Sequence, residues 1–210
     1  MTYAVKECFL TLQGEGVQSG SRAVFLRFAG CNLWSGREQD RATAQCNFCD
    51  TDFVGTDGEG GGKFRSPEEL AAQVERLWGH GGDARLVVIT GGEPMLQLDQ
   101  PLIEALHQRG FRVAVETNGT LPAAAGLDWI CVSPKAGTEV VQQQGDELKL
   151  VWPQTGIDPA ELEGWAFDHF LVQPMDCAEC EAALEAAIAL AMERPKWRLS
   201  LQAHKVAGLP

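Results

Sequence analysis

Three cysteines near the N-terminus have a spacing that suits ligands of one metal centre. Cys46 and Cys49 form a C-x-x-C pair, and fourteen residues separate Cys31 from Cys46. A polar insert at 35–41 accounts for much of that gap, and we expect it to loop out and return. Four thiolates would close an iron–sulfur cluster for electron transfer, whereas three leave one iron free to bind a substrate. The spacing therefore favours a catalytic iron–sulfur site.

A second C-x-x-C pair, formed by Cys177 and Cys180, supports a different interpretation. Two such pairs can form a four-thiolate zinc site, which would make the chain a zinc-stabilised binding module without catalytic activity. The same pair also suits the start of a helix, because Asp176 and Glu179 form a capping pattern there. In that case the two cysteines are small packing residues.

Short apolar runs alternate with helical patterns along the chain, which predicts an α/β fold with a mainly parallel sheet. Several runs are almost continuously apolar, as in strands that helices cover on both faces. The expected strands are 23–28, 86–90, 112–116, 129–132, 148–151, 169–173 and 199–202.

Three helices have clear start or stop signals. The first follows Ser66 and Pro67, the second runs from about Asp99 to Gly110, and the third runs from Asp176 to about Met192. The segments 117–128 and 133–147 give no helical pattern. A complete eight-unit barrel takes about 250 residues, so we expect one domain over 1–210 that forms an open, incomplete (β/α) barrel with some helices missing.

Composition narrows the class of protein. The 17 basic and 29 acidic residues give a net charge of −12, which argues against binding to nucleic acid. No apolar run approaches the roughly 20 residues of a membrane span, and the first residues lack a signal-peptide pattern. We therefore expect a soluble, cytoplasmic protein. Seven cysteines in such a chain indicate metal binding or catalysis rather than disulfides.

Six segments together resemble a family of radical S-adenosylmethionine (SAM) enzymes, the 7-carboxy-7-deazaguanine synthases, over nearly the whole chain. The segments are TLQGEG at 11–16, CNFCDT at 46–51, TGGEP at 90–94, ETNGT at 116–120, VSPK at 132–135 and LQAHK at 201–205. The usual superfamily spacing puts three residues between the first two cysteines, and here there are fourteen. Several segments follow an expected strand, where parallel barrels gather their active sites.

The resemblance implies a [4Fe–4S] cluster on Cys31, Cys46 and Cys49, with SAM chelating the open iron. One electron from the cluster would split SAM to give a 5′-deoxyadenosyl radical. Met175 suits core packing equally well. The residues implied to hold SAM are Gly91, Gly92, Glu93, Asn118, Ser133, Pro134, Lys135, Gln173, Pro174, Met175 and Asp176.

The resemblance also implies a substrate, 6-carboxy-5,6,7,8-tetrahydropterin. Hydrogen abstraction at C6, ring contraction and loss of ammonia would give 7-carboxy-7-deazaguanine for queuosine biosynthesis, the work of a carbon–nitrogen lyase. Arg27 would pair with the substrate carboxylate, and either Glu116 or His204 would move protons. The residues implied to bind substrate are Leu12, Gln13, Gly14, Glu15, Arg27, Thr90 and the terminal carboxylate of Pro210.

Other partners follow from the same resemblance. Magnesium would bind the Thr51 hydroxyl and the substrate carboxylate, with Asp50 as the competing ligand. The reductant would be a one-electron donor such as flavodoxin. An open barrel leaves sheet edges and apolar surface exposed, which favours a homodimer. The rival enzyme function is that of another small radical SAM protein, such as a glycyl-radical activating enzyme.

Overall fold

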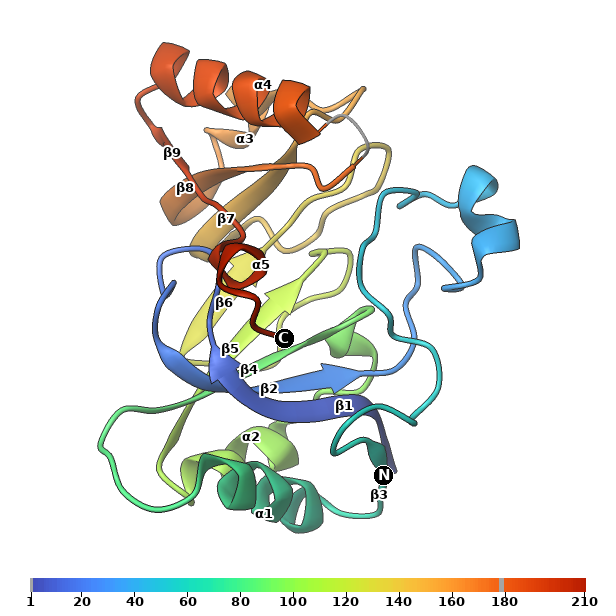
Figure 1. The fold of residues 1–210 in the computed structure, drawn as a ribbon, viewed down its shortest axis with the longest axis vertical. Helices are drawn as coiled ribbons and strands as arrows, with labels where there is room; N and C mark the ends of the chain where they lie inside the picture. The colour runs from blue at the N-terminus through green and yellow to red at the C-terminus, as the bar shows by residue number, and fades with distance from the viewer. Residues whose placement is uncertain (1, 178–179) are drawn as a thin grey trace.

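One nine-stranded sheet forms the framework of the protein, in the order β3-β1-β2-β4-β5-β6-β7-β8-β9 (Figure 1). The structure is a computed structural model that describes residues 2–177 and 180–210. From β2 to β9 all neighbouring strands are parallel, whereas β1 runs antiparallel to both β2 and β3. The strands are β1 (Tyr3–Leu12), β2 (Arg22–Phe28), β3 (Gly62–Phe64), β4 (Arg85–Gly91), β5 (Phe111–Thr117), β6 (Trp129–Val132), β7 (Gln144–Trp152), β8 (Ala166–Pro174) and β9 (Trp197–Leu199).

Six of the seven predicted strands are confirmed as β2 and β4–β8, in several cases with longer bounds. The prediction of a strand at 199–202 is wrong. The strand there is β9, which ends at Leu199. The Ser200 amide makes a last backbone hydrogen bond to Val172 of β8, and the chain then turns toward the segment after β1, where the Ala203 amide donates to Gly14. Ser200 donates its hydroxyl to Gln173, and Gln202 donates its amide to Glu15. The sequence analysis did not identify β1 and β3, which extend the sheet on its antiparallel side.

The helices with clear sequence signals form as predicted. α1 (Pro67–Trp78) begins after Ser66, whose hydroxyl accepts a hydrogen bond from the Glu69 amide, and α2 (Gln100–His107) begins after Asp99, whose carboxylate accepts from the Leu102 amide. The second helix ends three residues before Gly110. α4 is Cys180–Glu193, and the expected cap at Glu179 lies outside the described residues. Short elements were not predicted: α3 (Pro159–Leu162), α5 (Ala203–Ala207), and the 3₁₀ turns η1 (Glu38–Thr43) and η2 (Pro94–Leu96).

The sheet curves but does not close, which makes the fold an open, incomplete barrel. Within the described residues no helix covers the connections from β5 to β6 and from β6 to β7. The gap between β1 and β9 is bridged by the chain segments that follow these strands: the Ala203 amide donates to the Gly14 carbonyl at 2.8 Å, and the Gly16 amide donates to the Ser200 hydroxyl at 3.0 Å. Two segments about 190 residues apart thus meet at this seam.

Two large parts of the hydrophobic core lie on the outer face of the sheet, beside a separate small cluster of Ala23, Leu86, Val88 and Ala114. One part packs β1, β2, β4 and β5 against α1 and α2, and the other packs β6–β9 against α3 and α4 (Figure 1). Each fully buried aliphatic or aromatic side chain contributes about 1.5–3 kcal/mol relative to exposure, so the two helical layers fix the strands firmly. Among the described residues no helix has the length and apolarity to cross a bilayer.

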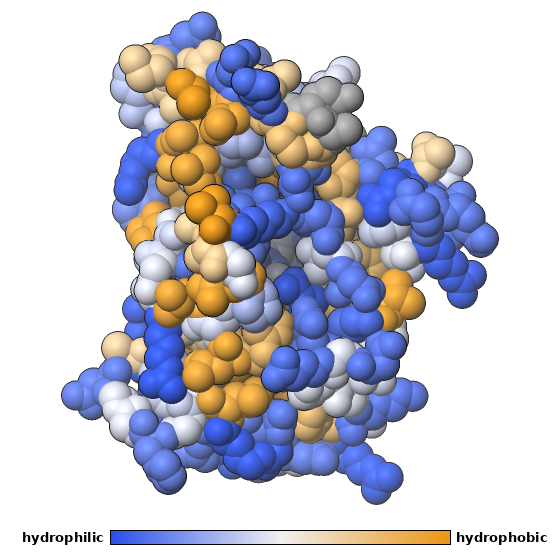
Figure 2. Space-filling model, in the orientation of Figure 1, coloured by the Kyte–Doolittle hydropathy of each residue, from blue (hydrophilic) through white to orange (hydrophobic). Residues whose placement is uncertain are grey.

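An apolar stripe is exposed across the open side of the sheet (Figure 2). It runs over α4, β9, α5 and β1 and consists of Leu184, Ile188, Leu199, Leu201, Val206, Leu10 and Leu12. We call it the open-edge stripe.

Candidate active site

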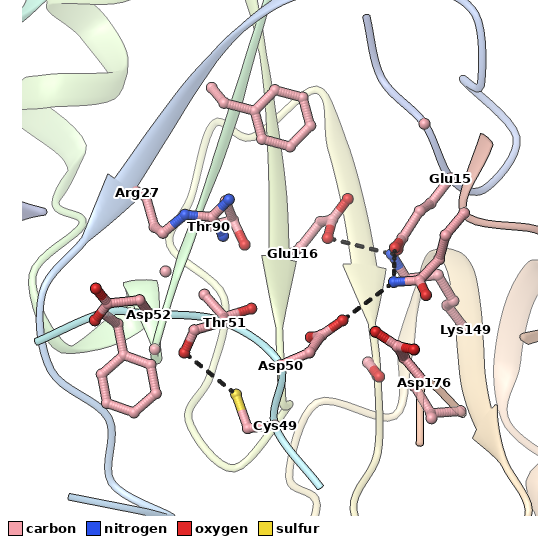
Figure 3. Close-up of a pocket in the computed structure, with 18 of the residues that line it drawn as sticks. Glu15, Arg27, Cys49, Asp50, Thr51, Asp52, Thr90, Glu116, Lys149 and Asp176 are labelled. Atoms are coloured by element: carbon pink, nitrogen blue, oxygen red, sulfur yellow. Dashed lines mark hydrogen bonds and ion pairs between the residues drawn. The ribbon is translucent and has the colours of Figure 1, made fainter. Parts of the chain in front are cut away.

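The carboxyl ends of the parallel strands open into a cavity of about 400 Å³ (Figure 3). Its wall combines residues from β1, β2, β4, β5, β7 and β8 with Ser133 and Lys135 after β6, the segment 31–53 and the C-terminal segment. Parallel barrels place their functional groups at these strand ends. The volume lies in the range typical of sites for small molecules and cofactors.

Cys31, Cys46 and Cys49 all line this cavity. Among the described residues, no three His, Cys, Asp or Glu side chains converge on a position for a single metal ion. A zinc ion needs its ligands about 2.0–2.3 Å from one point, whereas an iron–sulfur cluster binds each cysteine through a different iron and keeps them apart. Three thiols suit a cluster with one open iron, because each would bind a different iron.

The second cysteine pair does not join the first. Cys177 and Cys180 lie outside the wall of the cavity in the described part of the chain, and Cys180 is exposed at the start of α4. Its thiol points to the carbonyl of Cys177 and lies 3.6 Å from Asp176. A four-thiolate zinc site built from both pairs is therefore not formed.

The protonation of the cavity cysteines depends on their neighbours. The hydrogen bond between the two thiols lowers the pKa of Cys49 to about 6 and raises the pKa of Cys46. The Lys135 ammonium acts on both and favours their thiolates, whereas burial raises the pKa of Cys31. Because metals bind the thiolate, Cys49 is the readiest ligand of the three.

The insert between Cys31 and Cys46 folds back onto the cysteine loop. Its turn η1 places the Arg41 guanidinium 4.1 Å from the centre of the Trp34 ring. From there Nη1 of Arg41 donates to the carbonyls of Asn47 and Cys49, at 2.9 and 3.1 Å. The sequence analysis did not identify Arg41, which holds the backbone on both sides of Phe48.

The glycines after β4 allow close backbone approach. A Cβ on Gly92 would lie 2.2 Å from the Gly30 carbonyl oxygen and 2.7 Å from Cβ of Cys31, and Gly91 has a φ of +132°. A side chain at either position would collide with the strand end that carries Cys31. Both glycines line the cavity and offer backbone groups there, as expected for residues that hold a cofactor.

Glu93 is placed differently from its neighbours. It is fully buried and does not line the cavity, and burial raises the pKa of its carboxyl. Its carboxylate accepts hydrogen bonds from the Thr117 hydroxyl at 2.7 Å, the Asn118 amide at 2.8 Å and the Met95 amide at 2.9 Å. In this structure Glu93 therefore positions the turn after β5, and any contact with SAM would be indirect.

Most other residues implied for SAM line the cavity. Lys135 donates to the carbonyl and the hydroxyl of Ser133, at 2.8 and 2.7 Å. Pro134 and Met175 do not reach the cavity wall; the Met175 amide instead extends the pairing of β7 and β8 by donating to Trp152. Those on the wall are Asn118, Ser133, Lys135, Gln173, Pro174 and Asp176.

Arg27 and Thr90 face the cavity as direct neighbours on β2 and β4 (Figure 3). Nε of Arg27 donates to Glu7 on β1 at 2.7 Å, which orients the guanidinium and leaves its two terminal nitrogens for another partner. The sequence analysis did not identify Glu7. Its charge within the apolar pattern of 3–12 was the available signal, because a charged residue on the concave face of a strand indicates a polar site.

A row of charged groups, of which Lys149 is buried and the two glutamates are half-buried, crosses the opposite wall. Lys149 on β7 contacts Glu15 at 2.5 Å and Glu116 at 3.2 Å (Figure 3). Gln13 donates to Glu116 at 2.9 Å, and Gln202 donates to Glu15 at 2.9 Å. The sequence analysis named the two glutamates and Gln13 for the site but took Lys149 only as part of a strand.

The C-terminal segment completes the cavity. His204 lies against Gly14 so closely that a Cβ on this glycine would lie 2.1 Å from Nδ1 of the imidazole. Lys205 forms ion pairs with Asp50 at 2.7 Å and Asp176 at 2.5 Å. Pro210 lines the cavity, and its carbonyl group accepts from the Thr11 hydroxyl at 3.3 Å. Leu12 also lies on the cavity wall.

Thr51 and Asp50 both reach the cavity, but their surroundings differ. One oxygen of Asp50 already accepts from Lys205 and, at 3.3 Å, from Gln202. The Thr51 side chain points into the space below Thr90 and Arg27 (Figure 3).

Comparison with known proteins agrees with this geometry. Residues 39–146 match the model of the radical SAM superfamily, a span that begins after Cys31 and contains the other two cavity cysteines. A 7-carboxy-7-deazaguanine synthase of Caulobacter vibrioides is 63% identical and one of Bordetella pertussis is 57% identical, each over 210 residues and the full length of both chains. A crystal structure of QueE from Escherichia coli superposes with a TM-score of 0.70 at 30% identity, covering 97% of this chain and 95% of that one.

Proposed function

The chain belongs to the 7-carboxy-7-deazaguanine synthase family of the radical SAM superfamily, and we propose that it converts 6-carboxy-5,6,7,8-tetrahydropterin into 7-carboxy-7-deazaguanine. The names of its full-length relatives favour this function over that of a glycyl-radical activating enzyme. The reaction removes ammonia by breaking a carbon–nitrogen bond, so we assign the enzyme to the carbon–nitrogen lyases.

One observation supports the proposal above all others. Three cysteines suited to a cluster and a set of hydrogen-bonding carboxylates and amides suited to a pterin edge line the same cavity of about 400 Å³. When bound, the cluster and SAM supply the radical that takes hydrogen from the substrate. The protein must then hold the pterin with C6 toward the cysteine side of the cavity and keep water out.

The residues on the wall suggest how the pterin is held. The free nitrogens of Arg27 and the Thr90 hydroxyl would bind the substrate carboxylate, with Glu7 fixing the arginine. Glu15 and Gln13 would bind the polar edge of the pterin ring. Glu116 and His204 are the candidates for moving protons during the loss of ammonia.

Magnesium is the third proposed cofactor, bound by the Thr51 hydroxyl together with the substrate carboxylate. Hard cations prefer oxygen ligands and keep several waters, so one protein ligand is enough when the substrate supplies another. The ion pair between Asp50 and Lys205 supports Thr51 as the ligand, because a metal ion at Asp50 would have to compete with that lysine.

We also propose a homodimer in which a second copy of the chain covers the open-edge stripe. Large apolar side chains from α4, β9, α5 and β1 are exposed together at the side where the sheet fails to close. Ile188→Glu should convert the dimer to a monomer in light scattering after gel filtration, whereas Glu185→Gln on the same helix should not. A variant that remains dimeric would place the interface elsewhere.

A cytoplasmic location and a one-electron donor such as flavodoxin complete the proposal. All seven cysteines are free, which suits a reducing compartment. The proposed cluster must receive one electron before it can split SAM.

The function is tested by anaerobic incubation of the reconstituted protein with SAM, dithionite, Mg²⁺ and the carboxypterin. Mass spectrometry should detect the ring-contracted product and ammonia. Cleavage of SAM without that product would favour a different radical SAM activity, and a protein that retains zinc and no iron would contradict the whole proposal.

A further inference from the structure

Lys149 is a buried cation on the wall of the cavity to which no role has been assigned. It is 4% exposed, and its strand neighbours Leu148 and Leu150 point to the opposite side, into the core. Removing an ammonium group from water is costly unless its charge and its donors are matched. Lys149 meets this requirement through Glu15 and Glu116 (Figure 3).

The two carboxylates are each held from two sides. Lys149 binds Oε2 of both, at 2.5 Å for Glu15 and 3.2 Å for Glu116. The remaining oxygen of Glu15 accepts from Gln202, and that of Glu116 accepts from Gln13. Lys149 on β7 thus links Glu116 on β5 to Glu15, which Gln202 holds from the other side of the seam. Together these residues form one hydrogen-bonded wall.

Glu15 and Lys149 stabilise each other's charged forms. Burial alone would raise the pKa of Glu15, but the nearby ammonium outweighs it and lowers the pKa to about 2. Burial alone would lower the pKa of Lys149, and Glu116 with Glu15 raises it well above its usual value. The other titratable or charged groups that act on Lys149 or are acted on by it are Cys131, Glu147 and Lys135.

We propose that Lys149 is a positioning residue of the pterin site, whose ammonium keeps Glu15 and Glu116 together as hydrogen-bond acceptors for the N–H groups of the substrate. An ionised carboxylate only accepts hydrogen bonds, whereas a protonated one also donates and would meet the pterin N–H groups with the wrong polarity. This inference rests on the proposed function, because it takes the pterin as the ligand of the wall.

Lys149→Met removes the cation that lowers the pKa of Glu15. Burial then acts alone on that carboxyl, so its pKa should rise above its ordinary value. Below that raised pKa Glu15 holds a proton and binds substrate poorly; above it the acceptor is restored. We expect the KM for the carboxypterin to fall by up to about tenfold per pH unit between about pH 6 and about pH 8 in this variant, and to change little in the parent enzyme. Lys149→Arg keeps the charge and should keep the flat profile.

A second readout does not depend on turnover. Infrared spectroscopy of the cluster-free protein at about pH 6 should show an additional protonated-carboxyl band in Lys149→Met that is absent from the parent and from Lys149→Met/Glu15→Gln. Lys6→Met is the matched control. Lys6 is also buried and paired with two carboxylates, but its partners Asp52 and Asp57 are exposed and should stay ionised.

Each outcome separates the inference from the proposed function. If the parent enzyme forms no ring-contracted product, the proposed function fails, whatever the infrared spectra show. If it does form product while Lys149→Met has a flat KM profile and no new band, Lys149 is merely structural and the inference is wrong. Circular dichroism checks folding, and Lys149→Gln, which keeps hydrogen-bond donors without charge, replaces the methionine variant if that one does not fold.

Discussion

The two ends of the cavity are built by different means. At the cysteine end, which contains Cys31, Cys46 and Cys49, backbone groups provide much of the framework. Gly92 lies directly against Gly30, and Arg41 holds the carbonyls of the cysteine loop. At the carboxylate end, which contains Glu15, Glu116 and Lys149, ion pairs between charged side chains provide the framework. The Lys149–Glu15 contact joins residues 134 positions apart.

This difference predicts two kinds of sensitivity. Substitutions at the cysteine end should remove the cofactor or distort the loop that holds it, because backbone packing leaves no room to adjust. Substitutions at the carboxylate end should leave the cofactor bound and change substrate binding and its pH dependence.

Cys46→Ala should abolish turnover and prevent iron incorporation, since a cluster on two cysteines lacks a required ligand. Iron analysis and the visible spectrum after anaerobic reconstitution measure the loss. Cys180→Ala is the control, because that thiol is exposed and outside the cavity wall. A brown, active Cys46→Ala protein would show that the cysteine end is wrongly assigned.

Arg27→Ala should raise the KM for the carboxypterin by roughly 10- to 100-fold, because each hydrogen bond to a charged group is worth about 1.5–3 kcal/mol. The cluster should remain bound, and slow cleavage of SAM without product should persist. Arg27→Lys keeps the charge but loses the paired N–H donors with which a guanidinium binds both oxygens of a carboxylate. Its KM should therefore lie between those of the parent and the alanine variant. Full activity of Arg27→Ala would exclude it from substrate binding.

Thr51→Ala should raise the Mg²⁺ concentration needed for half-maximal turnover several-fold and leave iron content unchanged. Asp50→Asn should leave the Mg²⁺ response close to that of the parent, because this carboxylate is engaged by Lys205. A titration of activity with Mg²⁺ distinguishes the two. The reverse result would make Asp50 the ligand.

Arg41→Ala should have the smallest effect, a loss of about 1–2 kcal/mol from its hydrogen bonds and its contact with Trp34. We expect a lower Tm of the cluster-free protein and faster loss of iron during gel filtration, with the KM for the pterin unchanged. Arg37→Ala, an exposed arginine in the same insert, should behave like the parent. Identical Tm and iron retention in both variants would mean that the insert does not stabilise the cysteine loop.

Much of the fold follows from local patterns in the sequence. The strands from β4 to β8 contain short, mainly apolar runs, and α1 and α2 begin at side-chain caps that the structure shows. β1 was missed because charged residues interrupt its apolar pattern. Lys6 binds Asp52 and Asp57, and Glu7 lines the cavity and binds Arg27. β9 was misplaced because its neighbour in the chain, Leu201, is apolar yet exposed at the open edge.

The site was less predictable, for a physical reason. Motifs indicated which strand ends carry polar residues, and most of those residues do line one cavity. A motif does not show which groups a carboxylate binds. Glu93 follows two cavity glycines, but its oxygens accept hydrogen bonds from Thr117, Asn118 and Met95 instead of facing the cavity. The partners of Lys149 are distant in sequence, at separations of 134 and 33 residues, and only the curved sheet brings them together. The sequence pattern therefore could not indicate these contacts.

In the proposed enzyme both ends of the cavity act on one substrate, and the transfer of an isotope from that substrate to SAM would show it. The protein would be incubated with SAM, reductant and carboxypterin that carries deuterium at C6, and the SAM-derived products would be analysed by mass spectrometry. Our account predicts deuterium in the 5′ position of the adenosyl group, together with ring-contracted product. Cleavage of SAM with no deuterium transferred, while the substrate is bound, would contradict it.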